Sequence, residues 1–374
     1  MFQRTVTVNE KFFHSYQPIF QISRLVGLSP LTYKKITKSM YSFQWSWPLC
    51  ICNHVAITAL TILGFWGLYT FLKENAQGFI WSSVSKSNYF AILDFGELEM
   101  FGFYFVISQP FGFGKMSTLL HGFDQIDSLV APSESEDDRR WTIIFGCVVL
   151  LVFSLVVVFD GVVIWSNVSG SELGLKDYPF YIIYFVVIVF EIQYWQLVYL
   201  IERRMRLVNR ELEKNNHATI LNAIRAYECI YDAINTLNNL FNVHVSLIIL
   251  SCFLRLVLDL YMLYVTLTGG EDLVLILVQL AWIFIHFCRL LIILEVCQMC
   301  ENQNQKTFNL VLSLITCFTH EKIKKELSNF ALELTQKKIK FSSFAIPRIN
   351  RSLLTTVISS ITTFLIIFIQ FSAS

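Results

Sequence analysis

The chain has 374 residues, of which 55% are hydrophobic and 15% are charged, and its formal net charge is +1. Soluble domains contain roughly 45–50% apolar and about 25% charged residues, so this composition is that of a polytopic membrane protein. Residues 1–17 mix charged and polar side chains without an apolar core, which predicts that no signal peptide is cleaved.

Seven stretches are long and apolar enough to cross a bilayer, since a helix needs about 20 apolar residues to span the hydrocarbon. The second stretch is the weakest because Asp94, Glu97 and Glu99 interrupt it. The predicted spans are Pro48–Leu72, Tyr89–Phe111, Trp141–Trp165, Tyr178–Ile201, Phe241–Leu267, Leu273–Gln298 and Ser352–Phe371.

The lysines and arginines between these spans predict the orientation. Of 29 such residues, 24 lie in the N-terminal segment and the second, fourth and sixth loops, and 3 lie in the other loops. The remaining two, Arg255 and Arg289, fall inside spans. Because positive charge marks the cytosolic side, we expect the N-terminus inside and the C-terminus outside.

The resulting organisation has four parts. We expect a cytosolic N-terminal segment at 1–47, six spans at 48–298, cytosolic anchor helices at 299–349, and a seventh span with a short extracellular tail at 350–374. Within the second part, residues 202–240 contain no Pro or Gly and predict a continuous cytosolic helix with apolar residues at three- and four-residue steps. The apolar faces of these cytosolic helices could pack within one subunit or join several subunits, and their basic residues could contact anionic lipid.

Sites for modification and metal binding are few. Asn167 begins a sequon that the predicted topology places outside, where glycosylation is an even chance, whereas the sequon at Asn350 lies inside. Cys297 and Cys300 form half of a metal-site pattern, but we expect ordinary reduced thiols, no metal and no cofactor. No catalytic constellation is visible in the sequence, which predicts a protein that is not an enzyme.

The last predicted span has two different faces. On a helical wheel, one arc of about 120° holds most of its polar and small side chains, and the opposite face is nearly all apolar. This arc contains Thr356, Ser359, Ser360, Thr363, Ile367, Gln370 and Phe371. Such a stripe can serve close helix packing in lipid or line a water-filled path, which would require several copies around an axis.

The end of the chain resembles the insect gustatory receptors. Members of that family end in Thr-Tyr, five hydrophobic residues and Gln-Phe; this chain has Thr363-Phe364, five hydrophobic residues and Gln370-Phe371. The preceding LELTQKKIKFSSFAIPRINRSLLTTVISSI is similar to the lead into that family's last span. Phe364 replaces Tyr, which removes one hydroxyl group from the pattern.

This resemblance implies an all-α, ligand-gated, nonselective cation channel in the plasma membrane of sensory-neuron dendrites. It implies four subunits, identical or mixed with other gustatory receptors, whose last spans surround a pore, with Gln370 and Phe371 at the gate and Ile367 and Thr363 following. The expected partners are a small-molecule tastant, permeating cations and membrane lipid. No G protein and no nucleic acid is implied.

The same resemblance implies a ligand pocket in the outer half, where ionisable residues inside spans are costly and point to function. A sugar could bind there by ring stacking and hydrogen bonds to carboxylates, and a cationic alkaloid by cation–π contacts; we expect a bitter-type ligand. Arg255 and Asp259 are four residues apart and are expected to pair on one helix face. The candidate residues are Asp94, Glu97, Asp160, Tyr184, Asp259, Tyr261, Gln279 and Trp282.

Other classes fit less well. A G-protein-coupled receptor has the opposite orientation and an Asn-Pro pair in its seventh span, and this seventh span has no proline. A secondary transporter could use Asp94, Glu97, Asp160 and Glu191 as an ion relay, but repeats and Gly- or Pro-broken spans are expected there and no repeat is visible. The hypothesis of a non-conducting receptor or co-subunit is not excluded by the sequence.

Overall fold

The computed structural model describes residues 5–37, 40–75, 86–130, 135–167, 178–269, 273–318 and 320–373. Within these ranges the side chains of 5–6, 11, 15, 71–75, 86–95, 135–139, 163–167, 178 and 371–373 are not described. The expectations for Asp94, for glycosylation of Asn167 and for Phe371 at the gate therefore lie outside the described side chains.

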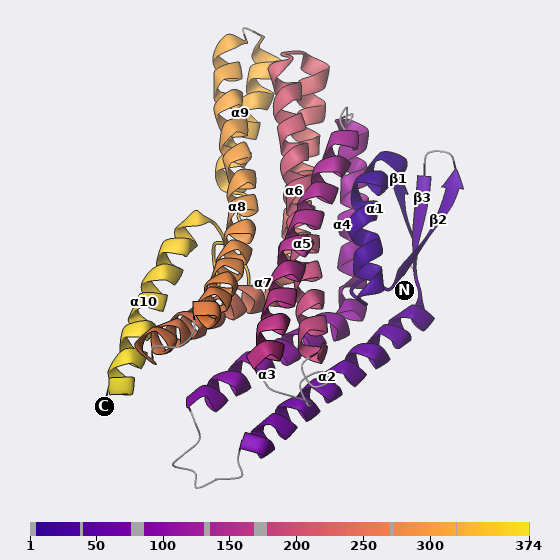
Figure 1. Ribbon diagram of the computed structural model, residues 1–374. Coiled ribbons are helices and arrows are strands. Elements are labelled where there is room, and N and C mark those ends of the chain that lie inside the picture. Colours follow the sequence, from indigo (N-terminus) through magenta and orange to yellow (C-terminus); the bar gives the residue numbers. More distant parts are fainter. Residues whose placement is uncertain are drawn as a thin grey trace.

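Long helices make up most of the described chain (Figure 1). The protein is therefore mostly helical, as predicted. The helices are α1 (Glu10–Leu25), α2 (Trp47–Asn75), α3 (Lys86–Ile107), α4 (Gln109–Leu129), α5 (Ser135–Asn167), α6 (Tyr178–Glu213), α7 (His217–Gly269), α8 (Leu273–Cys317), α9 (Glu321–Gln336) and α10 (Arg351–Ala373).

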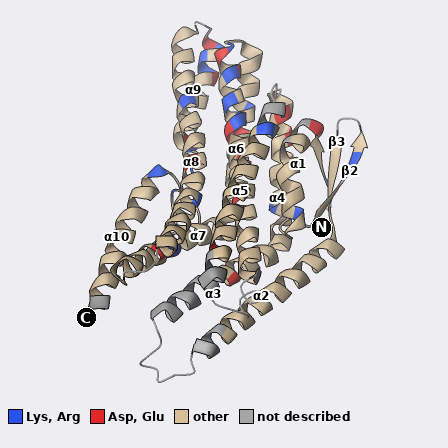
Figure 2. Ribbon diagram, viewed as in Figure 1, with Lys and Arg blue, Asp and Glu red and all other residues tan. Residues whose placement is uncertain are grey.

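Within the described residues, six helices are long and apolar enough to cross a membrane, namely α2, α5, α6, α7, α8 and α10. The second predicted span coincides with most of α3, which is not among the six, so the count of seven spans stays a prediction. Charged residues gather towards the α9 end of the molecule, whereas α2 and α10 carry few (Figure 2). That the α9 end is cytosolic stays a prediction.

The core surrounds α6. In its most apolar window 78% of residues are buried inside the molecule, against 17% for α2 and α5 and 11% for α10. The last helix docks on α7 and α8 through only a few buried residues, including Val357 and Ile361. Most of its surface is thus available to lipid or to other subunits.

A three-stranded antiparallel sheet, absent from the sequence-based expectation of an all-helical chain, forms within the N-terminal segment. Its strands are β1 (Thr5–Asn9), β2 (Leu31–Thr37) and β3 (Met40–Trp45), in the order β1-β3-β2. Helix α1 covers the sheet, where Phe13 stacks on Tyr41 with 3.9 Å between ring centroids. The backbone N–H of Asn9 donates to Asp124 Oδ1 at 3.1 Å, which ties the sheet to α4.

Two helix boundaries differ from the predictions. The predicted continuous helix at 202–240 is wrong, because Asn215 adopts a left-handed φ of 56°, a conformation that asparagine tolerates well, and separates α6 from α7. Asn216 Oδ1 accepts the backbone N–H of Ala218 at 3.2 Å and thereby caps α7. The second predicted span also runs past a boundary at Ser108, which precedes α4; Pro110 lies in the first turn of α4, where its missing backbone N–H is tolerated.

Candidate functional site

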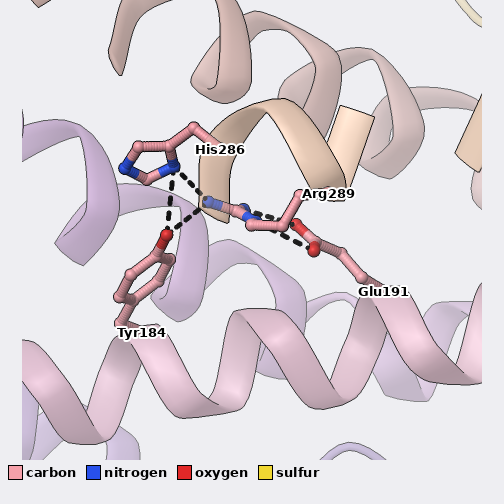
Figure 3. Close-up of polar contacts among 4 residues, drawn as sticks. All are labelled: Tyr184, Glu191, His286 and Arg289. Atoms are coloured by element: carbon pink, nitrogen blue, oxygen red, sulfur yellow. Dashed lines mark hydrogen bonds and ion pairs between the residues drawn. The ribbon is translucent and has the colours of Figure 1, made fainter. Parts of the chain in front are cut away.

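A buried ion pair joins α6 to α8 at the centre of the bundle (Figure 3). The Arg289 guanidinium on α8 donates through Nε to Glu191 Oε2 on α6 at 3.0 Å, and its Nη2 also pairs with Glu191 Oε1. Nη1 of Arg289 donates to the Tyr184 hydroxyl at 2.7 Å. Two buried charges are thus neutralised, and the fork of the guanidinium fixes the distance between the two helices.

His286, one turn before Arg289, extends this network. Its Nδ1 lies 3.1 Å from Arg289 Nη1 and 3.1 Å from the Tyr184 hydroxyl. Since a guanidinium only donates, Nδ1 must be the acceptor, and the proton of the neutral ring sits on Nε2. That Nε2 faces Asp259 Oδ2 at 3.5 Å, so the ring connects α7 to α6 and α8.

Asp160 on α5 connects two aromatic residues to this network. Its Oδ2 accepts hydrogen bonds from the Tyr181 hydroxyl at 2.8 Å and from Trp282 Nε1 at 3.2 Å. The Trp282 ring stacks on His286 with 5.8 Å between centroids and an interplanar angle of 18°, and lies 5.6 Å from Tyr184. Four candidate residues from four helices are thereby brought together, namely Asp160, Tyr184, Asp259 and Trp282.

Arg255 adds a second cation to this group, which we call the polar cluster (Asp160, Tyr181, Tyr184, Glu191, Arg255, Asp259, Trp282, His286 and Arg289). Its guanidinium lies over the rings of Phe180 and Tyr184, at 5.6 and 5.3 Å from their centroids. The expected pairing of Arg255 with Asp259 stays a prediction. The chemistry of the cluster combines stacked aromatic faces with paired acids and cations, which suits a ligand that carries several hydroxyl groups.

Three further candidate ligand residues lie beside or outside this cluster. Gln279 on α8 donates to Thr266 Oγ1 on α7 at 2.9 Å. Tyr261 is buried against α10, with its ring 5.7 Å from that of Phe368. Glu97 is half-buried on α3 and lies near Cys252 of α7, which Glu191, Arg255 and Arg289 of the polar cluster also approach. Tyr261 links the bundle to the last helix.

The predicted pore-lining residues of α10 face away from the subunit. Thr363, Ile367 and Gln370 are exposed, while Val357 and Ile361 on the opposite face are buried. The Thr363 hydroxyl donates to the Ser359 carbonyl at 3.0 Å, so it is satisfied within its own helix. The polar face identified on the helical wheel is therefore left uncovered by the rest of the chain.

Residues that the sequence did not single out hold the start of α10. Arg348 Nη2 donates to Glu301 Oε2 on α8 at 2.8 Å, and this hydrogen bond raises the pKa of Arg348 above its ordinary value. Arg351 donates through Nε and Nη2 to the Glu295 carboxylate at 2.7 and 2.6 Å. Their partners are 47 and 56 residues away in the chain, so no local pattern could pair them.

The cysteine pair on α8, Cys297 and Cys300, is buried. Cys297 Sγ lies 3.6 Å from the Tyr194 hydroxyl and Cys300 Sγ lies 3.3 Å from Met205 Sδ. Across the part of the chain that the structure describes, no three His, Cys, Asp or Glu side chains are grouped so that they could hold a metal ion.

Comparison with known proteins identifies the family. The sequence profile described as 7tm Chemosensory receptor matches residues 16–374. The chain belongs to this chemosensory receptor family. The resemblance to insect gustatory receptors is thereby confirmed at the level of the family.

Two relatives in Drosophila melanogaster are gustatory receptors. The gustatory receptor for sugar taste 43a is 24% identical, over 94% of this chain and 97% of the relative. The putative gustatory receptor 28b is 26% identical over 41% of this chain and 34% of the relative. A bitter-type ligand, the sequence-based expectation, finds no support in these relatives.

The solved structures support the fold. The insect olfactory receptor OR5 from Machilis hrabei superposes with a TM-score of 0.69 at 12% identity, covering 95% of this chain and 97% of that one. The same receptor in complex with eugenol gives a TM-score of 0.70 with the same coverage. This chemosensory receptor is thus a multi-pass membrane protein with the fold of an insect olfactory receptor, and the matches point to a receptor, not an enzyme.

Proposed function

We propose that the protein is a tastant-gated, nonselective cation channel of four subunits in the plasma membrane of chemosensory neurons, with a cytosolic N-terminus. The observation that carries this proposal is the uncovered polar face of α10, with Thr363 and Gln370 exposed. One such face cannot enclose a path, but four around an axis would line one. Partner subunits are copies of this chain or other gustatory receptors, and no G protein takes part.

The polar cluster is the proposed ligand site, and a sugar or related polyol is the proposed ligand. Aromatic rings such as Trp282 offer stacking surfaces for a sugar ring, and carboxylates such as Asp160 and Asp259 accept hydroxyl hydrogen bonds. The similarity to a receptor for sugar taste favours this class over a bitter one. Binding would require the sugar hydroxyls to replace bonds such as that from Trp282 Nε1 to Asp160.

A transporter is the weaker reading. Two of its proposed relay acids are engaged by donors of the protein, Glu191 by Arg289 and Asp160 by Tyr181 and Trp282. Both would have to release these donors in order to carry an ion.

The test is a sugar and polyol panel applied to cells that express the receptor, with whole-cell current as the readout. We expect at least one sugar to evoke an inward cation current, and Trp282→Ala to raise its half-maximal concentration by about tenfold or more, because a stacking ring and one hydrogen bond are lost. Trp66→Ala is the matched control, since Trp66 is exposed on α2. Surface-expressed protein that responds to alkaloids but to no sugar would overturn the ligand class.

A further inference from the structure

The exposed surface of α7 changes from polar to apolar within about one turn. Every exposed residue of α7 at positions 222–239 is polar, and every exposed residue at positions 243–267 is apolar. The residues nearest to the change are Asp232, Asn235 and Asn239 on the polar side, and Val243, Leu250 and Leu254 on the apolar side. Because polar side chains are costly in hydrocarbon, this pattern places a membrane boundary on α7 between positions 239 and 243.

Helix α4 shows the same change beside α7. Phe111 is 84% exposed, whereas each exposed residue of α4 after it, beginning with Lys115, is polar. Lys115 Nζ donates to the Asn239 carbonyl of α7 at 3.0 Å. Phe111, Lys115 and Val243 also line one cavity of about 310 Å³. The changes on α4 and α7 therefore lie at one level.

The segment between α9 and α10 reaches this level from another side of α7. Lys340 is exposed, and Phe344, four residues later, is 80% exposed. Asn238 Nδ2 donates to the Lys340 carbonyl at 2.8 Å, and the backbone N–H of Phe344 donates to the Asn242 carbonyl at 3.4 Å. Three elements thus each place a lysine or an amide before an exposed apolar side chain, and hydrogen bonds hold the three together.

The exposed charge at this level has one sign. Residues 337–350 contain no Asp or Glu. Lys115, Lys338 and Lys340 are exposed, and within the described part of the chain none of the three is paired with a carboxylate. Lysines beside exposed aromatic rings at a membrane boundary match the two parts of an anionic lipid, a negative headgroup and an apolar tail.

We propose that this surface, the boundary patch (Phe111, Lys115, Lys338, Lys340 and Phe344), binds anionic phospholipid of the surrounding membrane. The lysines attract the headgroup phosphate, and the two phenylalanine rings lie among the upper parts of the acyl chains. A zwitterionic phospholipid gains the contact with the rings but not the net attraction to the lysines. This binding depends on the chain being a membrane protein and not on its being a channel.

Native mass spectrometry of the full-length receptor in mild detergent tests the patch without requiring current. The probes are phosphatidylglycerol and phosphatidylcholine with identical acyl chains. We expect phosphatidylglycerol to bind at least tenfold more tightly. Lys115→Gln with Lys340→Gln should remove most of this preference, since each lysine near a membrane surface contributes about fivefold. Phe344→Ser should weaken the binding of both lipids alike, because it removes only apolar contact.

The matched control is Lys324→Gln with Lys325→Gln. It removes the same charge from exposed positions of α9, and Lys325 is 12 residues, or about 18 Å of helix, before Lys337. Its lipid preference should equal that of the wild type. Equal affinity of the wild type for both lipids, or an equal loss in this control, would overturn the proposal. It would also fail if the Lys115 and Lys340 variant lost subunits from the particle while keeping its lipid preference, which would make the patch a contact between copies of the chain.

Discussion

Arg289 is the residue on which the proposed ligand site depends most. It is buried together with Glu191 and also donates to Tyr184, so a single side chain aligns α6, α8 and the ring on which Trp282 and His286 pack. A guanidinium does this better than an ammonium because its donors diverge in one plane. Loss of one partner leaves the other charge buried alone.

Arg289→Met is therefore expected to destabilise the receptor by about 3–5 kcal/mol, the usual cost of breaking a buried pair. The measurement is thermal unfolding followed by fluorescence-detected gel filtration. The double variant Arg289→Met with Glu191→Leu removes both charges and should be more stable than Arg289→Met alone. Equal instability of the single and double variants would show that volume, not charge, dominates.

At the scale of the element, α10 carries two chemically distinct faces. Thr362 and Thr363 are consecutive, and each hydroxyl donates to a backbone carbonyl one turn earlier, of Ile358 and Ser359 respectively. Their local chemistry is the same, yet they point about 100° apart around the helix axis. A comparison of Thr362 with Thr363 therefore tests whether the polar face lines a pore or only packs in the membrane.

Thr363→Cys and Gln370→Cys are expected to react with a charged, water-soluble thiol reagent and to lose current, because the proposed pore is wet. Thr362→Cys is the control, and its current should be unchanged. The readout is ligand-evoked current before and after the reagent, measured in a background that tolerates the reagent. Block of Thr362→Cys to the same extent would contradict the assignment of the faces.

The segment between α9 and α10, residues 337–350, holds the last helix to the rest of the bundle. Arg348 and Glu301 join this segment to α8, and Asn238 and Asn242 of α7 bond to its backbone at Lys340 and Phe344. This segment is thus attached to both α7 and α8.

Arg348→Glu should weaken this attachment and shift the half-maximal ligand concentration by about fivefold, since coupled charges interact by about 1 kcal/mol. Adding Glu301→Arg reverses the pair and should restore most of the shift. The measurement is a dose–response curve of current for both single variants and the double variant. Additive shifts in the double variant would rule out the direct pair as the cause.

Whether a feature could be predicted from the sequence depends on how far apart in the chain the residues that form it lie. Six of the seven predicted spans fall inside helices that the structure describes as long and apolar enough to cross a membrane, because apolar length is a local property. The turn at Asn215 and the boundary at Ser108 also had local markers, an Asn-Asn pair and Pro110, but the apolar periodicity on either side obscured them. The N-terminal sheet was missed because Lys34 and Lys35 interrupt the alternation in β2.

The polar cluster was only partly foreseen. Orientation and depth predicted that Asp160, Tyr184, Asp259 and Trp282 share the outer half of the bundle. Arg289 and Glu191 were not expected to meet, because 98 residues separate them and only the packing of α6 on α8 brings them together.

At the scale of the whole molecule, burial is uneven. α6 is covered on most sides, whereas α10 keeps 11% of its apolar window buried and exposes its polar face. A polar stripe facing hydrocarbon is unfavourable, and closed symmetric assembly is the usual way for a chain to cover such a surface.

The purified receptor is therefore expected to form a fourfold particle, visible in electron micrographs or by mass photometry in mild detergent. Truncation before Arg351 removes α10 and should abolish current, while the cytosolic ends of α8 and α9 should still support association. A monomer at micromolar concentration in several detergents and in nanodiscs would argue against the channel.

The central position of α6 has one more consequence. Phe190, whose ring stacks on His244 with 5.0 Å between centroids, and Glu191, which holds Arg289, are consecutive residues. Their side chains leave the helix about 100° apart, so a turn of α6 about its own axis moves both at once. A rotation of α6 that separated Glu191 from Arg289 would therefore also move Phe190 relative to His244.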